Sequence, residues 1–322
     1  MNKLPIDLIQ YCIFDKLGFK TQILFRQLCK RLNRIEIHNM YYYIMDKYLK
    51  KLSDNILINY SKIRYLNANN NPKIININDM TNLQMLIASG NCGIDDNSIK
   101  NLNLIGLNAS NNPKIRNVNH MTNLQILDAS HNSSIDDNCI KNINLIELYA
   151  SKNPKITNVN HMTNLQILHA VGNCGIDDNG IKHLNLIELN VSNNYKITNV
   201  NHMTNLQILN ASADCGIDDN GIKNLNLIKL DASYNSKITN VNHMTKLQIL
   251  HAPYNNGIDD NGIKNLNLIE LNVASNPKIT NVNHMTKLQI LTASFNSGIN
   301  DNGIKDLNLI KLYKYGNPKI NK

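Results

Sequence analysis

The sequence contains no tryptophan, and aromatic residues make up only 5% of its 322 residues. Hydrophobic residues nevertheless reach 42%, so a large core must be built mainly from leucine and isoleucine. The chain has no run of about 18 consecutive apolar residues, and no membrane span is therefore expected. Its first residues, MNKLPIDLIQYCIFDKL, lack the apolar stretch and small-residue cleavage site of a secretory signal.

Cysteines are also few, and they do not form a disulfide-scaffold pattern. Among the six, Cys92, Cys174 and Cys215 occupy the same phase of a repeat. This usage predicts a reduced, intracellular protein, which we expect in the cytoplasm or the nucleus. The net charge of +9 is compatible with an acidic partner. However, the lysines recur in register with aspartate pairs, so we interpret them as a solvated surface and do not expect nucleic acid as a partner.

What the sequence has in abundance is repetition. The phrase HMTNLQILDASHN at 120–132 returns as HMTNLQILHAVGN at 161–173, and the period of 41 residues is strict. Each period divides into two copies of L-x-x-L-x-A-x-x-N, spaced alternately by 20 and 21 residues. The thirteen copies begin at Ile63, Leu83, Leu104, Leu124, Leu145, Leu165, Leu186, Leu206, Leu227, Leu247, Leu268, Leu288 and Leu309.

This pattern resembles the leucine-rich repeat, with alanine at the third inward position. It predicts an α/β solenoid: a curved stack of about thirteen short parallel strands, forming an arc of roughly 60 Å at about 4.8 Å per strand. The asparagine at the ninth position is expected to turn the chain and bond buried backbone groups. Asp214 replaces it once, which predicts a local weak point.

The returns between strands differ in the two halves of the period. Ile156, Val159 and Met162 are spaced by three residues, which indicates an extended or 3₁₀ return similar to that of internalin-like repeats. The segment GIDDNGIKHLNL at 175–186 predicts a short helix that holds Ile181 and Leu184 and is capped by Asp177 or Asp178. The recurring Asp pairs fit no EF-hand or calcium nonapeptide spacing.

The copies differ from one another mainly at the fifth and eighth positions, whereas buried positions and convex turns scarcely vary. Solenoids bind on their concave face, so both columns are expected to line that face and to hold a protein target. Drift of unconstrained positions after a recent expansion of repeats is the alternative explanation. The candidate target-binding residues are Asp128, His131, Tyr149, Lys152, His169, Asn190, Asn193, Asp231, Tyr234, His251, Tyr254, Asn272, Thr292 and Phe295.

The N-terminal segment does not belong to the repeat. LPIDLIQYCIFDKLGFKTQILFRQLCKRLNRI at 4–35 has helical apolar spacing, and from the residues alone it could be a helical cap for the first repeat. Its opening Leu-Pro and its closing apolar–Cys–Lys–Arg cluster resemble the F-box. We therefore expect an F-box-like module at 1–37, a helical linker and cap at 38–62, and the solenoid at 63–322.

The F-box resemblance implies a Skp-type adaptor and a cullin–RING ubiquitin ligase as partners. Carried over by position, the docking residues would be Leu4, Pro5, Leu8, Ile9, Ile13, Leu17, Ile23, Leu24, Leu28 and Cys29. The resulting hypothesis is a ligase substrate receptor with no catalytic residues and no cofactor of its own. A free-standing repeat scaffold or inhibitor, whose N-terminal helices are only a cap, is the alternative.

Metal binding was also considered for the histidine column His120, His161, His202, His243 and His284. Successive members lie two repeats apart, or roughly 10 Å, which is too far for them to share an ion. We expect these histidines to be structural or exposed, and we predict no metal site.

Overall fold

The computed structural model describes residues 52–57, 63–254 and 256–321. The segment predicted as an F-box-like module, with every residue assigned to adaptor docking, lies outside these residues. The chain divides into two compact units, Met1–Tyr149 (unit 1) and Ala150–Lys322 (unit 2), which are described separately. Within the described segments no helix has the length and apolar character needed to cross a membrane.

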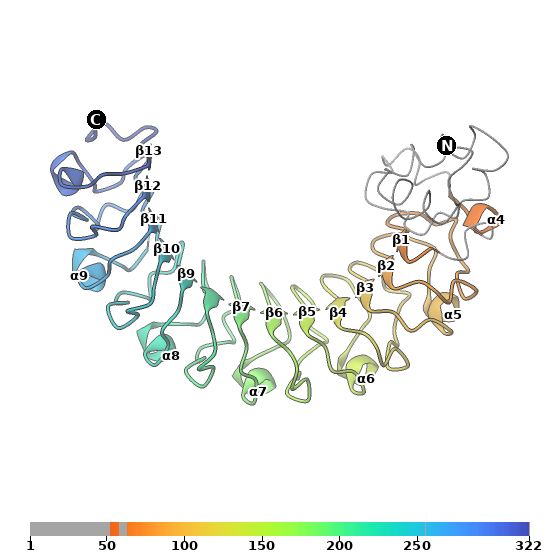
Figure 1. Ribbon diagram of the computed structural model, residues 1–322. Helices are drawn as coiled ribbons and strands as arrows, with labels where there is room; N and C mark the ends of the chain where they lie inside the picture. Colours follow the sequence, from red (N-terminus) through yellow and green to blue (C-terminus); the bar gives the residue numbers. More distant parts are fainter. Residues whose placement is uncertain (1–51, 58–62, 255, 322) are drawn as a thin grey trace, which may run out of the picture. The chain divides into compact units, whose positions relative to one another are not determined.

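Both units are built from three-residue strands, one in each repeat (Figure 1). Strands neighbouring in sequence pair in parallel within each unit. Unit 1 contains β1 (Tyr65–Asn67), β2 (Met85–Ile87), β3 (Gly106–Asn108), β4 (Ile126–Asp128) and β5 (Glu147–Tyr149). Unit 2 contains β6 (Ile167–His169), β7 (Glu188–Asn190), β8 (Ile208–Asn210), β9 (Lys229–Asp231), β10 (Ile249–His251), β11 (Glu270–Asn272), β12 (Ile290–Thr292) and β13 (Lys311–Tyr313).

The fold is the leucine-rich-repeat solenoid that the spacing predicts. Equivalent residues pair across the ladders; for example, Leu168 of β6 lies opposite Leu189 of β7. Both leucines are fully buried, whereas the residues flanking them on each strand are half-buried. The first, fourth and sixth positions of the copies therefore point into the core. The predicted inward pattern is confirmed.

The returns are short and are set by aspartate caps. Each helix begins at the second aspartate of a pair: α5 (Asp96–Ile99), α6 (Asp137–Ile140), α7 (Asp178–Ile181), α8 (Asp219–Ile222) and α9 (Asp260–Ile263). In α7 the Asp177 carboxylate accepts a hydrogen bond of 2.9 Å from the Gly180 N–H, so the first aspartate is the cap. Leu184 is buried, but it lies beyond the end of the helix, which is a single turn.

The second aspartate of each pair connects neighbouring repeats. Asp178 accepts hydrogen bonds from the backbone N–H of Thr198, at 2.8 Å, and from its hydroxyl, at 2.5 Å. In the last pair Asn300 replaces the capping aspartate, and the chain forms only the 3₁₀ turn η4 (Asn302–Ile304). At the other end α4 (Asp54–Leu57), in the predicted linker, supplies Asp54, which accepts from the Ile75 N–H at 2.9 Å. The capping interpretation of the aspartates is confirmed.

The predicted asparagine column is correct for only one half of the period. In the 20-residue copies the ninth-position asparagine is buried and bonds the preceding repeat. Asn194 donates from Nδ2 to the carbonyls of Ala170, at 2.9 Å, and Ile176, at 3.2 Å. Its Oδ1 accepts from the Lys196 N–H at 3.0 Å. The other buried members are Asn71, Asn112, Asn153, Asn235, Asn276 and Asn317.

In the 21-residue copies the turn has one more residue, so the tenth position is buried instead. Asn91, Asn132, Asn173 and Asn296 are exposed, and so is Asp214. The prediction of a weak point at Asp214 is therefore wrong, because its carboxylate is not in the buried column. The buried residues are Cys92, Ser133, Cys174, Cys215, Asn256 and Ser297.

The buried cysteines serve this same column. The Cys215 thiol donates to the Ala211 carbonyl at 3.2 Å and receives a hydrogen bond from Asn235 Nδ2 at 3.4 Å. Burial raises the pKa of Cys215 to about 11. The thiol is therefore protonated at neutral pH and acts as a packing group rather than as a nucleophile.

This difference between the two copies is testable. Replacing Asn194 by Ala leaves two buried carbonyls and one N–H without their partners, so the free energy of unfolding should fall by roughly 2–4 kcal/mol. The matched change Asn173→Ala, at the same position of an exposed copy, should change it by less than about 0.5 kcal/mol. Guanidinium titrations followed by circular dichroism measure both values. Equal losses in the two variants would contradict the assignment.

Candidate interaction surface

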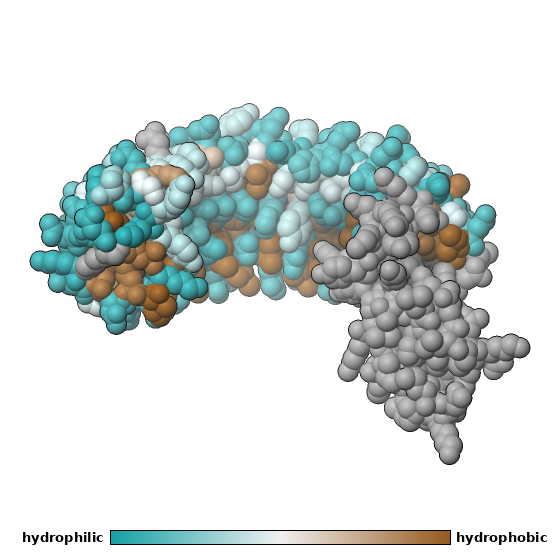
Figure 2. All heavy atoms as spheres, turned by 90° about the horizontal axis from the view of Figure 1, so that it is seen from above, coloured by the Kyte–Doolittle hydropathy of each residue, from teal (hydrophilic) through white to brown (hydrophobic). Residues whose placement is uncertain are grey.

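The predicted target-binding residues all lie on the solvent side of the strands or directly after them. We call this side, formed by the third, fifth and eighth positions of the copies, the strand face. The fifth-position candidates are half-buried and the eighth-position candidates are exposed; none is in the core. Unit 1 holds Asp128, His131 and Tyr149, and unit 2 holds the other candidates. Figure 2, seen from above, shows hydrophobic atoms among mainly hydrophilic ones on this side.

The third position is a column of this face that the sequence comparison missed. Its residues lie two places before the fifth position, and a strand puts such residues on the same side. In the 21-residue copies of unit 2 this position is always isoleucine, at 167, 208, 249 and 290. In the 20-residue copies it is charged, and includes Glu188, Lys229 and Glu270. The alternation of side chains along a strand would have been enough to predict this column from the sequence.

The eighth position has an unexpected backbone conformation in every copy. All thirteen residues have φ between +53° and +68°, the left-handed region. Six of them are Gly or Asn, the residues that adopt this region at least cost. The others are His131, Lys152, Ala213, Tyr234, Tyr254, Ser275 and Phe295. The convex turns are nearly invariant, whereas this column varies even where its backbone disfavours the residue present.

The eighth positions of adjacent repeats also touch. A Cβ added to Gly316 would lie 3.3 Å from the Phe295 ring, and one added to Gly172 would lie 3.2 Å from Lys152 Cγ. In unit 2, Tyr234 and Tyr254 stack with ring centroids 4.2 Å apart and planes at 11°. Phe295 meets Tyr315 edge to face at 5.7 Å. Tyr315, a seventh-position residue that is 79% exposed, was not among the sequence candidates.

A charged cluster crosses three strands beside the stacked tyrosines. His251 of β10 lies between Asp231 of β9 and Glu270 of β11. Its Nε2 is 3.3 Å from Glu270 Oε1 and its Nδ1 is 3.9 Å from Asp231 Oδ2. The Asp231 carboxylate and, to a smaller extent, Glu270 raise the pKa of His251, while partial burial opposes them. A related contact of 3.7 Å joins His169 to Glu188.

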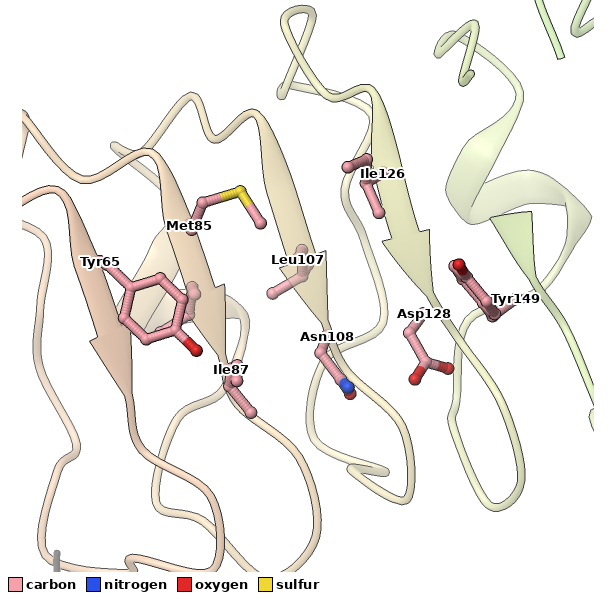
Figure 3. Close-up of a pocket in the computed structure, with 9 residues that line it drawn as sticks. Tyr65, Met85, Ile87, Leu107, Asn108, Ile126, Asp128 and Tyr149 are labelled. Carbon is pink, nitrogen blue, oxygen red and sulfur yellow. The ribbon is translucent and has the colours of Figure 1, made fainter. Parts of the chain in front are cut away.

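Unit 1 has a hollow of about 390 Å³ on its strand face (Figure 3). Met85, Ile87 and Ile126 give it an apolar lining, and Asn108, Asp128 and Tyr149 contribute polar groups. Between Met85 and Ile126 the third position is Gly106, in the one copy of the sequence that has no side chain there. A Cβ placed there would lie 2.5 Å from the end of the Met85 side chain. The glycine therefore makes room for the Met85 side chain, which lines the hollow.

The histidine column is structural, as the sequence predicted. The Nε2 atoms of His120, His202, His243 and His284 lie 3.1–3.2 Å from the carbonyl oxygen of the last helical residue in the preceding copy. Such carbonyls have no partner inside the helix. Over the described segments, no group of three or more His, Cys, Asp or Glu side chains is arranged to hold a metal ion.

Known structures share this fold. An internalin, InlF, from Listeria monocytogenes superposes with a TM-score of 0.57 at 20% identity, over 82% of this chain and 84% of that one. The functional domain of InlJ from the same organism gives 0.46 at 21%, over 80% and 64% of the two chains. The yeast complex of Rad7 and Elc1 gives 0.39 at 15%, over 94% and 89%.

No family model matches the sequence, and no curated protein sequence matches it either. The likeness to InlF, at 20% identity, establishes the fold alone. The fold class is therefore that of leucine-rich-repeat proteins, and the function has to be argued from the strand face.

The charged cluster makes a prediction about His251. Its pKa should lie above the ordinary 6.5 because protonation is favoured by the two carboxylates. In Asp231→Asn, which keeps an oxygen to accept from the Ser233 N–H, that pKa should fall because the negative charge that raises it most is removed. NMR titration of the His251 ring protons measures it, with Asp306→Asn as a distant control.

The sign of the effect on stability follows from the raised pKa. The attraction is complete below pH 6.5 and is lost as the pH rises through the His251 pKa in the folded protein. An unchanged titration midpoint in Asp231→Asn would show that the two side chains do not interact.

Proposed function

We propose that this protein is a non-enzymatic interaction scaffold that binds a protein partner on its strand face. The observation that carries the proposal is a contrast between positions of the repeat. The buried positions and the turns are nearly invariant, whereas the eighth position varies. In unit 2 that column keeps aromatic side chains exposed on a backbone that favours Gly or Asn. Tyr234 is 54% exposed, Tyr254 37% and Phe295 48%. Aromatic residues are the commonest anchors of protein interfaces.

The hollow of unit 1 supports the same proposal. It is apolar, open to the strand face and wide enough for a side chain of a partner. Asp128 and Tyr149 at its edge offer hydrogen-bonding groups that would orient the bound chain. Apolar depressions with a few polar groups are the usual form of binding sites.

The more specific proposal is that the scaffold is a substrate receptor of a Skp–cullin–F-box ubiquitin ligase. Only the sequence of residues 4–35 supports this role, through Leu4-Pro5 and the cluster that ends at Leu28-Cys29. The N-terminal segment would bind a Skp-type adaptor while the strand face holds the target. The chemistry of ubiquitin transfer would then belong to the partner proteins. In the alternative, the N-terminal helices only cap a free-standing binding scaffold.

Adaptor binding separates these two proposals. The full chain expressed with a Skp-type protein should co-purify with it. Changing Leu4, Pro5 and Leu28 together to Ala should reduce recovery of the adaptor by at least about tenfold, because the apolar contacts of the docking surface are removed. A triple change on the solvent side of the helical returns, Lys182→Ser with Lys223→Ser and Lys264→Ser, is the control. Failure of the unaltered chain to retain the adaptor would leave the free-standing scaffold.

Target binding is tested separately on the strand face. Proximity labelling by the full chain should enrich a set of proteins that is lost from the variant Tyr234→Asn, Tyr254→Asn and Phe295→Asn. Asparagine already stands at this left-handed position in three copies, so the variant is expected to fold. Tyr195→Ser, which removes an even more exposed aromatic ring from a turn, is the matched control. Identical labelling by the two variants would exclude the strand face of unit 2 as the binding surface.

A further inference from the structure

The exposed aromatic row of unit 2 has the form of a docking surface. We use this name for the row that contains Tyr234, Tyr254 and Phe295. In the stacked pair each tyrosine ring covers one face of the other, and its second face points away from the pair. Equivalent residues of successive repeats lie about 4.8 Å apart, so the row extends over roughly 15 Å from Tyr234 to Phe295. An extended polypeptide segment has a matching length and shape.

Folding does not require aromatic side chains at these positions. Each has φ between +57° and +64°, where a residue other than Gly or Asn costs roughly 1 kcal/mol or more. Asn70, Asn111 and Asn193 occupy the equivalent positions of other copies with the same backbone. The five successive copies from Ala213 to Phe295 contain neither Gly nor Asn at this position. The row is therefore maintained against the backbone preference.

The charge beside the row indicates what it binds. The whole chain carries +9, from 33 basic and 24 acidic residues. Lys152 is the one lysine of the eighth column of the strand face, whereas the third and fifth columns have an excess of acids. In unit 2 they contain three acids and two lysines, a net charge of −1, and in unit 1 two acids and no lysine, a net charge of −2. These residues are Glu188, Asp231, Glu270, Lys229 and Lys311 in unit 2, and Asp128 and Glu147 in unit 1.

The carboxylates of Asp231 and Glu270 are partly exposed on the strands either side of His251. Asp231 lies three residues before Tyr234, and His251 three residues before Tyr254, so these two members of the cluster share their repeats with the tyrosines. Glu270 belongs to the following repeat, whose eighth residue is Ser275. The Asp231 and Glu270 side chains are 24% and 34% exposed. Lys229, the remaining charged residue of this area, forms no ion pair with either acid among the described residues.

From the exposed aromatic row and its acidic border we infer that this surface binds an arginine-containing segment of a partner protein. A guanidinium group stacks on tyrosine faces and donates paired hydrogen bonds to carboxylates, so it uses both features at once. A phosphate-bearing partner would be repelled by the same carboxylates. The inference rests on the proposed role as a protein-binding scaffold and specifies the chemistry of its partner.

His251 would make this binding dependent on pH. The groups that face it are Asp231, Lys229 and Tyr234 from the β9 repeat and Glu270 from β11, with Tyr254 in its own repeat. While His251 is neutral, the two carboxylates present a charge of −2 to the ligand. Protonation reduces this to −1 and occupies the carboxylate oxygens. Affinity for a cationic side chain should therefore rise with pH through the raised pKa of His251.

The test uses the full chain and three matched fluorescent peptides. Each is a Gly/Ser peptide carrying at alternate positions either arginine, its neutral isostere citrulline, or glutamate. Fluorescence anisotropy should show binding of the arginine peptide at least about tenfold tighter than that of the citrulline peptide, and no binding of the glutamate peptide. Asp231→Asn with Glu270→Gln should weaken the arginine peptide by about tenfold, and Tyr234→Asn with Tyr254→Asn by a similar factor.

Two controls separate a specific site from general charge attraction. Asp306→Asn and Tyr195→Ser remove an exposed acid and an exposed aromatic ring elsewhere in unit 2, and they should change the affinity by less than about twofold. His251→Gln should abolish the rise in affinity between about pH 6 and 8 that the unaltered chain shows. Unchanged thermal melting would show that the variants are folded.

Equal affinity for the arginine and citrulline peptides would overturn the inference. So would unchanged binding in the tyrosine variant, or tighter binding of a single-stranded oligonucleotide at the same row. The proximity-labelling experiment separates this failure from that of the proposed function. If the arginine peptide does not bind but the aromatic-row variant still loses its labelled proteins, the scaffold role stands and only the arginine specificity fails. If the labelled proteins also remain, both proposals fail.

Discussion

The whole solenoid depends on satisfying the backbone carbonyls at the end of each strand. A strand of three residues is too short to pair all its flanking groups in the sheet, and the chain then turns inside the core. The carbonyls of Ala170 and Ile176 are enclosed there, and the Asn194 amide of the following repeat supplies both hydrogen bonds. Because a buried unpaired carbonyl is costly, no repeat is complete without its neighbour. Repetition is thus a physical requirement as well as a feature of the sequence.

The same requirement explains why the true period contains two copies. The 20-residue copy closes tightly, so its ninth residue is enclosed and asparagine donates across to the preceding repeat. The 21-residue copy makes a wider turn, and a cysteine, serine or asparagine at the tenth position enters the core. The one-turn helix that follows needs a capping aspartate, and the second aspartate then holds the next return. Several polar residues of the repeat, among them Asn194 and Asp178, have their partner in a neighbouring copy, which limits how far the repeat can change.

The side chains of the strand face can vary without disturbing the core. The backbone of the third, fifth and eighth positions bonds the neighbouring repeats, but the side chains there lie outside the core, and these are the ones that vary. The left-handed backbone of the eighth column favours glycine and asparagine, so each residue found there can be compared with that preference. Glycine and asparagine follow that preference, whereas Tyr234, Tyr254 and Phe295 do not. The strand face of unit 2 also lacks the basic excess of the whole chain, and both departures concern side chains that lie outside the core.

The sequence by itself determined the repeat, the number of strands, the inward leucines and the aspartate caps, because these depend on local spacing and on contacts that recur in every copy. It did not reveal which asparagines are buried, since one additional residue in the turn shifts the buried position from ninth to tenth. Nor did it reveal the positive φ of the eighth column, which the folded turn imposes on whatever residue stands there. Asp231, His251 and Glu270 are about twenty residues apart in sequence and meet only because parallel strands align equivalent positions. The F-box-like segment still rests on its sequence, because its residues lie outside the described structure.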